Sequence, residues 1–187
     1  MRKMNQRQSN EHLYSDFQTR AWILTMLILA TLGIQADEDN TLQRLPLIDN
    51  SGTYSRPIST QNSATQAYFD QGLRFAWGFY FPEAIASYQT ASELDPTHPM
   101  PYWGLAHAMG PNPNSRYARM PDDPKGEGAK AIAAAVARIA RATPKEAKLI
   151  TALEKLYDQA QRPSAQDRDT AYLAAMRDLN QQYPTDP

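Results

Sequence analysis

Two histidine–methionine pairs are the residues of this chain whose types and spacing could do chemistry. His98 precedes Met100 and His107 precedes Met109, so each imidazole lies two positions before a thioether. Nitrogen and sulfur ligands together suit Cu(I), a soft ion, and the pairs raise the hypothesis of a copper site. Residues two apart on a helix point in different directions, which favours structural roles instead. We therefore predict no metal or cofactor, with a site at His98, Met100 and His107 as the alternative.

The sequence contains no arrangement typical of an enzyme active site. It has no phosphate-binding loop, no Gly-x-Ser-x-Gly elbow and no His-Glu-x-x-His motif. Cysteine is absent, which excludes disulfides, thiolate zinc sites and a cysteine nucleophile. A formal net charge of −1 provides no basic field for nucleic acid. We expect neither an enzyme nor a nucleic-acid-binding protein.

Aromatic side chains offer a second kind of site, at which a partner binds. Aromatic residues are frequent between positions 68 and 103, and helical spacing places most of them in a core. Those outside the main spacing could anchor a peptide, with packing against neighbours as the alternative. Together with polar residues of the following loop, they form the predicted partner-binding set: Trp77, Tyr80, Trp103, Asn112, Asn114 and Arg116.

The loop that carries the polar members of this set interrupts an otherwise helical chain. Residues 110–128 read GPNPNSRYARMPDDPKGEG, with four prolines and no helical period. Irregular loops of this length are uncommon in compact domains and are often functional. Asparagines that satisfy turn backbone and arginines that are merely solvated are the structural alternative.

The helices that must position these candidates begin with a pair in residues 67–96. Aromatic and small residues recur at helical spacing on both helices: Tyr68, Gly72, Phe75, Phe79, Ala84, Tyr88 and Ala91. Gly72 and Ala84 are small enough for the two helices to cross there, with Phe75 and Tyr88 filling the volume beside the crossing. Pro96 ends the second helix, because it disfavours helical geometry at the preceding residue.

This order of residues resembles the tetratricopeptide repeat, a helix–turn–helix unit of about 34 residues. The matching positions are Tyr68, Gly72, Phe75, Ala84, Tyr88, Ala91 and Pro96. Gln71 departs from the pattern, since the family usually has an apolar residue there. Residues 68–112 also resemble the N-terminal part of bacterial secreted proteins that contain such repeats. The resemblance implies antiparallel helix pairs stacked as a short right-handed superhelix, whose concave groove binds a peptide or protein partner.

Further helices follow the first pair, so the predicted fold is all-α. We expect them over residues 97–109, 129–142, 143–162 and 164–183. Three helix starts have the spacing of a capping pair: Ser63 with Gln66, Thr143 with Glu146, and Ser164 with Asp167. The chain ends on Asp186-Pro187, where a further repeat would begin, and we therefore expect a truncated part of a longer protein.

The first 36 residues have the parts of a secretory signal peptide. Basic residues precede an apolar run of 13 residues, Trp22 to Ile34, and Ala36 precedes an acidic segment. The run is shorter than the roughly 20 residues that span a bilayer, so we expect cleavage after Ala36, with an uncleaved membrane anchor as the alternative. Residues 37–62 are polar and aperiodic, and we expect an extended leader before a repeat domain over 63–187.

These features together predict an exported interaction module, periplasmic or secreted, that holds a peptide or protein partner in a concave groove. The alternative is a periplasmic small-ligand or copper-binding protein, which would use the helix between His98 and Met109 and the loop over 110–128. A nonfunctional fragment is the third possibility. Membrane contact is expected only through the N-terminal segment, if it stays uncleaved.

Overall fold

A computed structural model describes residues 45–110 and 124–186 of the chain. All regular elements in these ranges are helical, and the prediction of an all-α fold is confirmed for them. In chain order they are α2 (Ser63–Trp77), α3 (Phe81–Leu94), α4 (Pro99–Met109), α5 (Pro124–Val136), the short 3-10 helix η2 (Ile139–Arg141), α6 (Pro144–Tyr157) and α7 (Ala165–Gln182). The signal peptide, the start of the leader, and Asn112, Asn114 and Arg116 lie outside the described residues.

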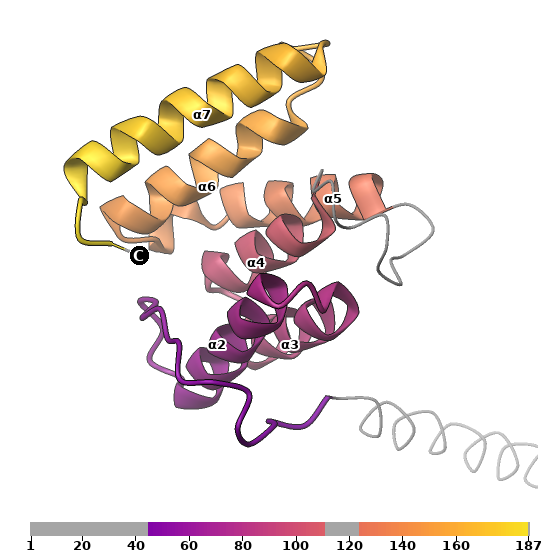
Figure 1. Ribbon diagram of the computed structural model, residues 1–187, viewed down its shortest axis with the longest axis vertical. Helices are drawn as coiled ribbons and strands as arrows, with labels where there is room; N and C mark the ends of the chain where they lie inside the picture. Colours follow the sequence, from indigo (N-terminus) through magenta and orange to yellow (C-terminus); the bar gives the residue numbers. More distant parts are fainter. Residues whose placement is uncertain (1–44, 111–123, 187) are drawn as a thin grey trace, which may run out of the picture. The chain divides into compact units, whose positions relative to one another are not determined.

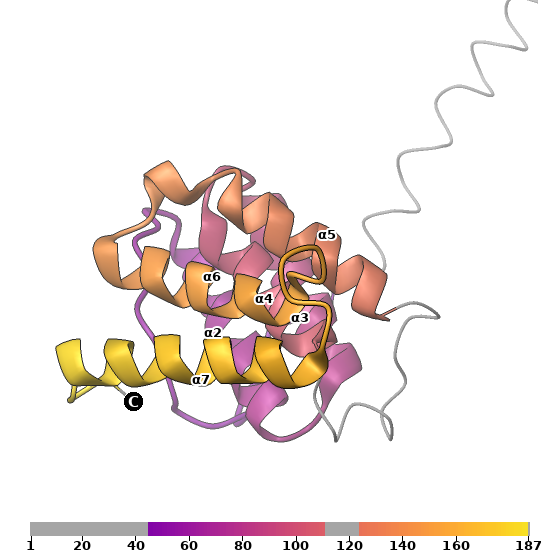
Figure 2. The same cartoon turned by 90° about the horizontal axis from the view of Figure 1, so that it is seen from above.

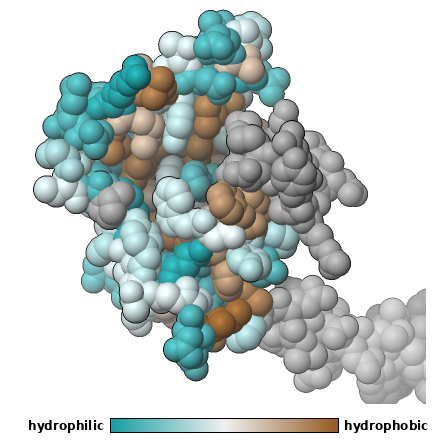
Figure 3. Space-filling view, in the orientation of Figure 1, coloured by the Kyte–Doolittle hydropathy of each residue, from teal (hydrophilic) through white to brown (hydrophobic). Residues whose placement is uncertain are grey.

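Neighbouring helices along the chain pack side by side, from α2 and α3 to α6 and α7 (Figure 1). The α7 helix lies along α6 at the edge of the stack in both views (Figure 2). Its only buried residue is Leu179, while Leu173 is exposed. Apolar side chains show between hydrophilic ones over this α6–α7 region (Figure 3). Among the residues that the structure describes, no helix has the length and apolar character needed to cross a membrane.

Two of the three predicted capping pairs begin helices. Thr143 and Glu146 form a reciprocal capping box at the start of α6, and Ser164 accepts a hydrogen bond from the amide of Asp167 at the start of α7. At α2 the prediction is wrong by one residue, since Asn62 is the cap. Its Oδ1 accepts from the amides two and three residues later, at 3.0 and 3.2 Å.

The expected loop over 110–128 is too long at its end, because α5 begins at Pro124. Gly128 is therefore helical, and a Cβ atom at this position would lie 2.3 Å from the hydroxyl of Tyr157. Glycine here permits close packing of α5 on α6. The expected helix over 129–142 is also wrong at its end, since α5 stops at Val136 and only η2 follows.

Tyr88 packs against the backbones of two helices at the centre of the core. A Cβ atom at Gly72 of α2 would lie 2.6 Å from its ring, and one at Gly104 of α4 would lie 2.4 Å from it. Phe69 completes the cluster, with its ring centroid 5.6 Å from that of Tyr88. The predicted close approach at Gly72 is confirmed, and the equivalent role of Gly104 was not predicted.

Candidate functional site

Residues 45–62, here called the strap, form an extended segment that lies beside α2 (Figure 1). Gln71 of α2 is fully buried and binds the strap's main chain. Its Oε1 accepts a hydrogen bond from the amide of Ile48 at 2.7 Å, and its Nε2 donates to the carbonyl of Pro46 at 3.2 Å. This contact explains the polar residue at a position where an apolar one was expected, since a buried amide must find partners.

Two further residues of α2 hold the middle of the strap. Asp70 accepts a hydrogen bond from the amide of Arg56 at 2.9 Å. Gln66 accepts from the amide of Ile58 at 2.9 Å and donates to the carbonyl of Arg56 at 3.0 Å. The strap's amides at alternate positions thus bond to α2 side chains much as they would bond to a neighbouring strand.

Arg74 extends the same row of side chains towards the end of α2. Its guanidinium donates to the carbonyl of Tyr54 at 2.9 Å and to the hydroxyl of Ser51 at 3.2 Å. Gln66, Asp70 and Arg74 follow at steps of four residues, with Gln71 beside them, so one side of α2 carries all four. We call these four residues the clamp. The clamp bonds mainly to main-chain groups, and it can therefore hold an extended peptide largely independently of that peptide's side chains.

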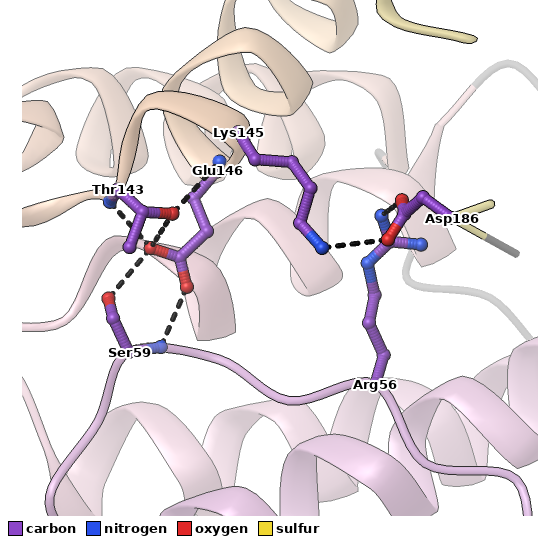
Figure 4. A network of polar contacts seen from close by, with 6 residues as sticks. All are labelled: Arg56, Ser59, Thr143, Lys145, Glu146 and Asp186. Carbon is purple, nitrogen blue, oxygen red and sulfur yellow. Dashed lines mark hydrogen bonds and ion pairs between the residues drawn. The ribbon is translucent and has the colours of Figure 1, made fainter. Parts of the chain in front are cut away.

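The strap also binds the start of α6 through Glu146, which is 4% exposed (Figure 4). The carboxylate accepts hydrogen bonds from the amide and hydroxyl of Ser59 at 2.8 and 2.7 Å, and from the amide and hydroxyl of Thr143 at 2.7 and 2.9 Å. Burial alone would raise the pKa of Glu146, but these hydrogen bonds outweigh it and hold the pKa below its usual value. Glu146 is thus a carboxylate that caps α6 and anchors the strap at once.

A cluster of charges joins the strap to the residues that follow α7. The carboxylate of Asp186 forms ion pairs with Arg56 of the strap and with Lys145 of α6, the latter at 2.7 Å (Figure 4). The side chains of Arg56 and Asp186 are only 10% and 12% exposed. Partly buried pairs are screened little by salt, so this contact fixes Arg56 in place.

His98, Ser59 and Glu146 have the residue types of a catalytic triad, but their hydrogen bonds run in the wrong direction. His98 caps α4, and its Nδ1 accepts from the amide of Met100 at 3.2 Å. The imidazole proton therefore lies on Nε2, which donates to the Ser59 hydroxyl at 3.0 Å, while that hydroxyl donates to Glu146. The imidazole cannot accept the serine proton, so this arrangement is structural and does not activate a nucleophile.

The two histidines lie at opposite ends of α4, and the structure does not bring them together. Their positions are nine residues apart, which corresponds to about 13.5 Å along a helix. His107 stacks on Trp103 with ring centroids 5.3 Å apart, and its buried Nδ1 has no hydrogen-bond partner among the described residues. Met100 is fully buried in the core. Within residues 45–110 and 124–186, no three histidine, cysteine or acidic side chains form a group that could hold a metal ion.

The predicted aromatic anchors divide between surface and core. Trp77 and Tyr80 are 65% and 59% exposed, at the turn between α2 and α3. Trp103 is 8% exposed, and its Nε1 donates to the carbonyl of Leu149 at 3.2 Å. Assignment of Trp103 to a partner surface was therefore wrong, because it fills the core between α4 and α6. A pocket of about 450 Å³ lies next to Trp77, between the clamp residue Arg74 and strap residues 51–54.

Phe79 was predicted on the buried side of the first helix, and this prediction is wrong, because α2 ends at Trp77 and Phe79 lies exposed beyond it. It has a left-handed backbone, with φ of 64°, and is 58% exposed. Its amide bonds to the carbonyl of Ala76, and the amide of Tyr80 bonds to the carbonyl of Phe75, at 3.1 and 2.9 Å. This is the Schellman ending of a helix, in which glycine usually occupies the position of Phe79. A strained and exposed phenylalanine is poorly explained by stability alone.

No protein-family model, curated protein or solved structure matches this chain.

Proposed function

We propose that this chain is an exported interaction module of the tetratricopeptide type, which binds an extended segment of a partner along α2. The observation that carries the proposal is the clamp, four polar side chains of one helix that bond to the main chain of an extended segment. Stacked helix pairs present extended surfaces of this kind for binding. The right-handed superhelix and its concave groove are part of the proposal.

The exposed aromatic turn supports the same function. Trp77, Phe79 and Tyr80 lie at the end of α2, directly after the clamp residue Arg74. Rigid aromatic side chains are the usual anchors of protein interfaces, because they bury a large area with little loss of conformational freedom. A partner segment that lies on the clamp can continue onto this turn.

The proposed site of action is the periplasm or the exterior, reached through the signal peptide over residues 1–36. The apolar run from Trp22 to Ile34 and the following Ala36 support this assignment. Expression of the full chain in a bacterial host, with intact-mass measurement of the exported product, tests it. A product that begins at Asp37 is expected, and a product that stays in the cytoplasm at full mass would contradict export.

A random-peptide display library selected on the full-length chain tests the binding function. We expect enrichment of peptides that no longer bind when half of the clamp is removed by Gln66→Leu with Gln71→Leu. The matched control is Gln166→Leu on α7, an equally apolar change at an exposed position away from the clamp. A library that enriches nothing, on this chain and on a variant with a weakened strap, would refute the proposed function.

A further inference from the structure

We infer that the strap is an internal ligand of the clamp surface, and that residues 54–60 show the chemistry of the partner segment that replaces it. The inference rests on the proposed function and adds two things, the regulation of the site and the class of its partner. The partner segment is extended and carries an arginine, an aliphatic side chain two positions later, and a small hydroxyl residue directly after that.

The strap is bound as a peptide ligand is bound. The clamp and Glu146 bond to the amides of Ile48, Arg56, Ile58 and Ser59. Main-chain bonds of this kind supply affinity for any extended segment, and pockets for particular side chains supply specificity. Three strap residues make such specific contacts, namely Arg56, Ile58 and Ser59.

Arg56 enters an acidic environment. Its guanidinium pairs with Asp186, and the carboxylate of Asp70 lies against its own amide. Both aspartates are largely buried, and Lys145 balances only part of their charge. A segment with a glutamate at this position would be repelled, whereas an arginine is attracted, so the surface selects a basic residue.

Ile58 and Ser59 follow Pro57 and are recognised in different ways, Ile58 by the shape of its buried site and Ser59 by hydrogen bonds. The side chain of Ile58 is 8% exposed and belongs to the hydrophobic core. Ser59 fits between Glu146 and His98, with its hydroxyl 2.7 and 3.0 Å from them. Proline restricts the residue before it to extended geometry, so a segment such as Arg-Pro-Ile-Ser is already close to its bound shape.

The strap has little apolar contact to keep it in place. Ile58 is its one buried apolar side chain within residues 45–62, Tyr54 is half-buried, and Leu47 and Ile48 are 48% and 43% exposed. Segments with few buried apolar contacts open at lower free energy than the helices beside them. Because the strap continues directly into α2, its effective concentration at the clamp is high, on the order of millimolar. The strap therefore acts as a tethered competitor that a partner segment must displace.

Fluorescence anisotropy with the labelled peptide TYSRPISTQ, which copies residues 53–61, tests the inference. The full-length chain is compared with its Arg56→Ala, Ile58→Ala double variant, in which the strap is weakened and the clamp is intact. We expect the double variant to bind the peptide at least about tenfold more tightly, since the tethered competitor is weakened. The control peptide TYSAPASTQ should not bind. Equal binding of both peptides, or no binding to the double variant, would overturn the inference.

A charge reversal at Asp186, which lies after the last helix and outside the helical core, provides the second variant. Asp186→Lys should repel Arg56 and reverse the preference of the surface, so that TYSEPISTQ binds more tightly than TYSRPISTQ. If TYSRPISTQ still binds this variant more tightly than TYSEPISTQ, the proposed selection of a basic residue by acidic groups at this position is contradicted. If library selection enriches peptides but TYSRPISTQ does not bind, the inference fails while the proposed function stands. If both experiments give no binding, both fail.

Discussion

Phe79 is the residue whose local conformation is hardest to reconcile with stability. A left-handed backbone disfavours any residue with a Cβ atom by about 1–2 kcal/mol relative to glycine. The Phe79 side chain adds little packing energy to offset this cost. It is mostly exposed, and its ring packs edge-on against that of Phe81 with the two ring centroids 6.2 Å apart. Strain that serves no packing purpose is a feature of functional surfaces.

Replacement of Phe79 by glycine should therefore stabilise the protein. Relief of the backbone strain exceeds the added freedom of glycine in the unfolded chain, and we expect the free energy of unfolding to rise by about 0.5–1 kcal/mol. Phe79→Ala, which keeps the Cβ atom, is the control and should give no such gain. Urea unfolding measures both, and a destabilised glycine variant would show that the side chain has a structural role.

The two histidines of α4 should make stability depend on pH between about 7 and 5. Burial lowers the pKa of His107, and burial also lowers that of His98, where Arg141 adds to the effect and Glu146 and Asp95 oppose it. Below the ordinary value of 6.5 the unfolded chain binds more protons than the folded one, so stability is full above that pH and falls below it.

Urea unfolding at pH 7.5, 6 and 5 tests this dependence. His107→Phe keeps a ring on Trp103 without a titrating group, and it should lose less stability over this range than the unmodified chain. Depressed carboxyl pKa values, such as that of Glu146, act only below about 4.5 and do not interfere. Parallel pH profiles for the two proteins would exclude His107 as a source of the effect.

At the scale of the elements, local signals predicted the helices well and long-range contacts explain the failures. Proline and capping residues marked the starts of α6 and α7, because these act within a few residues. Gln66 has the spacing of a capping residue but bonds to the strap instead. Gly126 and Gly128 suggested a loop, yet Gly128 lies in α5 because Tyr157, far away in sequence, needs the space.

The start of α6 should be more sensitive to Glu146 than to its capping partner. Thr143→Ala removes the two hydrogen bonds between the Thr143 hydroxyl and Glu146, one from the amide and one to the carboxylate, and should lower the free energy of unfolding by about 1 kcal/mol. Glu146→Ala also releases Ser59 of the strap, and we expect about 2–3 kcal/mol. Thermal and urea unfolding of the two variants provide the comparison. Equal effects would mean that the strap contributes nothing through Glu146.

The crossing of α2 and α3 is tested by Gly72→Ala. The new methyl group would meet the Tyr88 ring at 2.6 Å, so we expect a loss of about 1–3 kcal/mol from overpacking. Gly78→Ala on the exposed end of α2 is the control. Its new methyl group would meet the exposed side chain of Tyr80 at 3.1 Å, which is free to move, so its effect should stay within about 0.5 kcal/mol. Tyr88→Leu should relieve the clash, and a Gly72→Ala variant as stable as the parent would contradict the crossing.

For the whole molecule, an extended segment was predicted before the first helix, but its attachment to α2 and α6 was the largest feature that the sequence did not predict. Its residues are polar and follow no period, so nothing local marks them as ordered. One signal was present, since Gln66, Asp70 and Gln71 interrupt the apolar side of α2 with groups that need partners when buried. Helical spacing left both a partner surface and packing against neighbours open for Trp77, Tyr80 and Trp103. Trp77 and Tyr80 are exposed, whereas the burial of Trp103 depends on α6, which is distant in sequence.

The strap connects α2, the start of α4, the start of α6 and the residues after α7. A partner that displaces it would therefore also loosen the contacts of Asp186 and Glu146, and would alter the molecule well beyond the clamp. Binding of a partner at the clamp is therefore coupled to rearrangement of the strap.

Hydrogen exchange of the full-length chain, followed by mass spectrometry with and without saturating TYSRPISTQ, tests this account most directly. We predict that amides of residues 53–60 exchange faster when the peptide is bound, while those of α2 remain protected, because the peptide has taken the place of this part of the strap. Unchanged exchange over residues 53–60 at saturating peptide would contradict displacement of the strap.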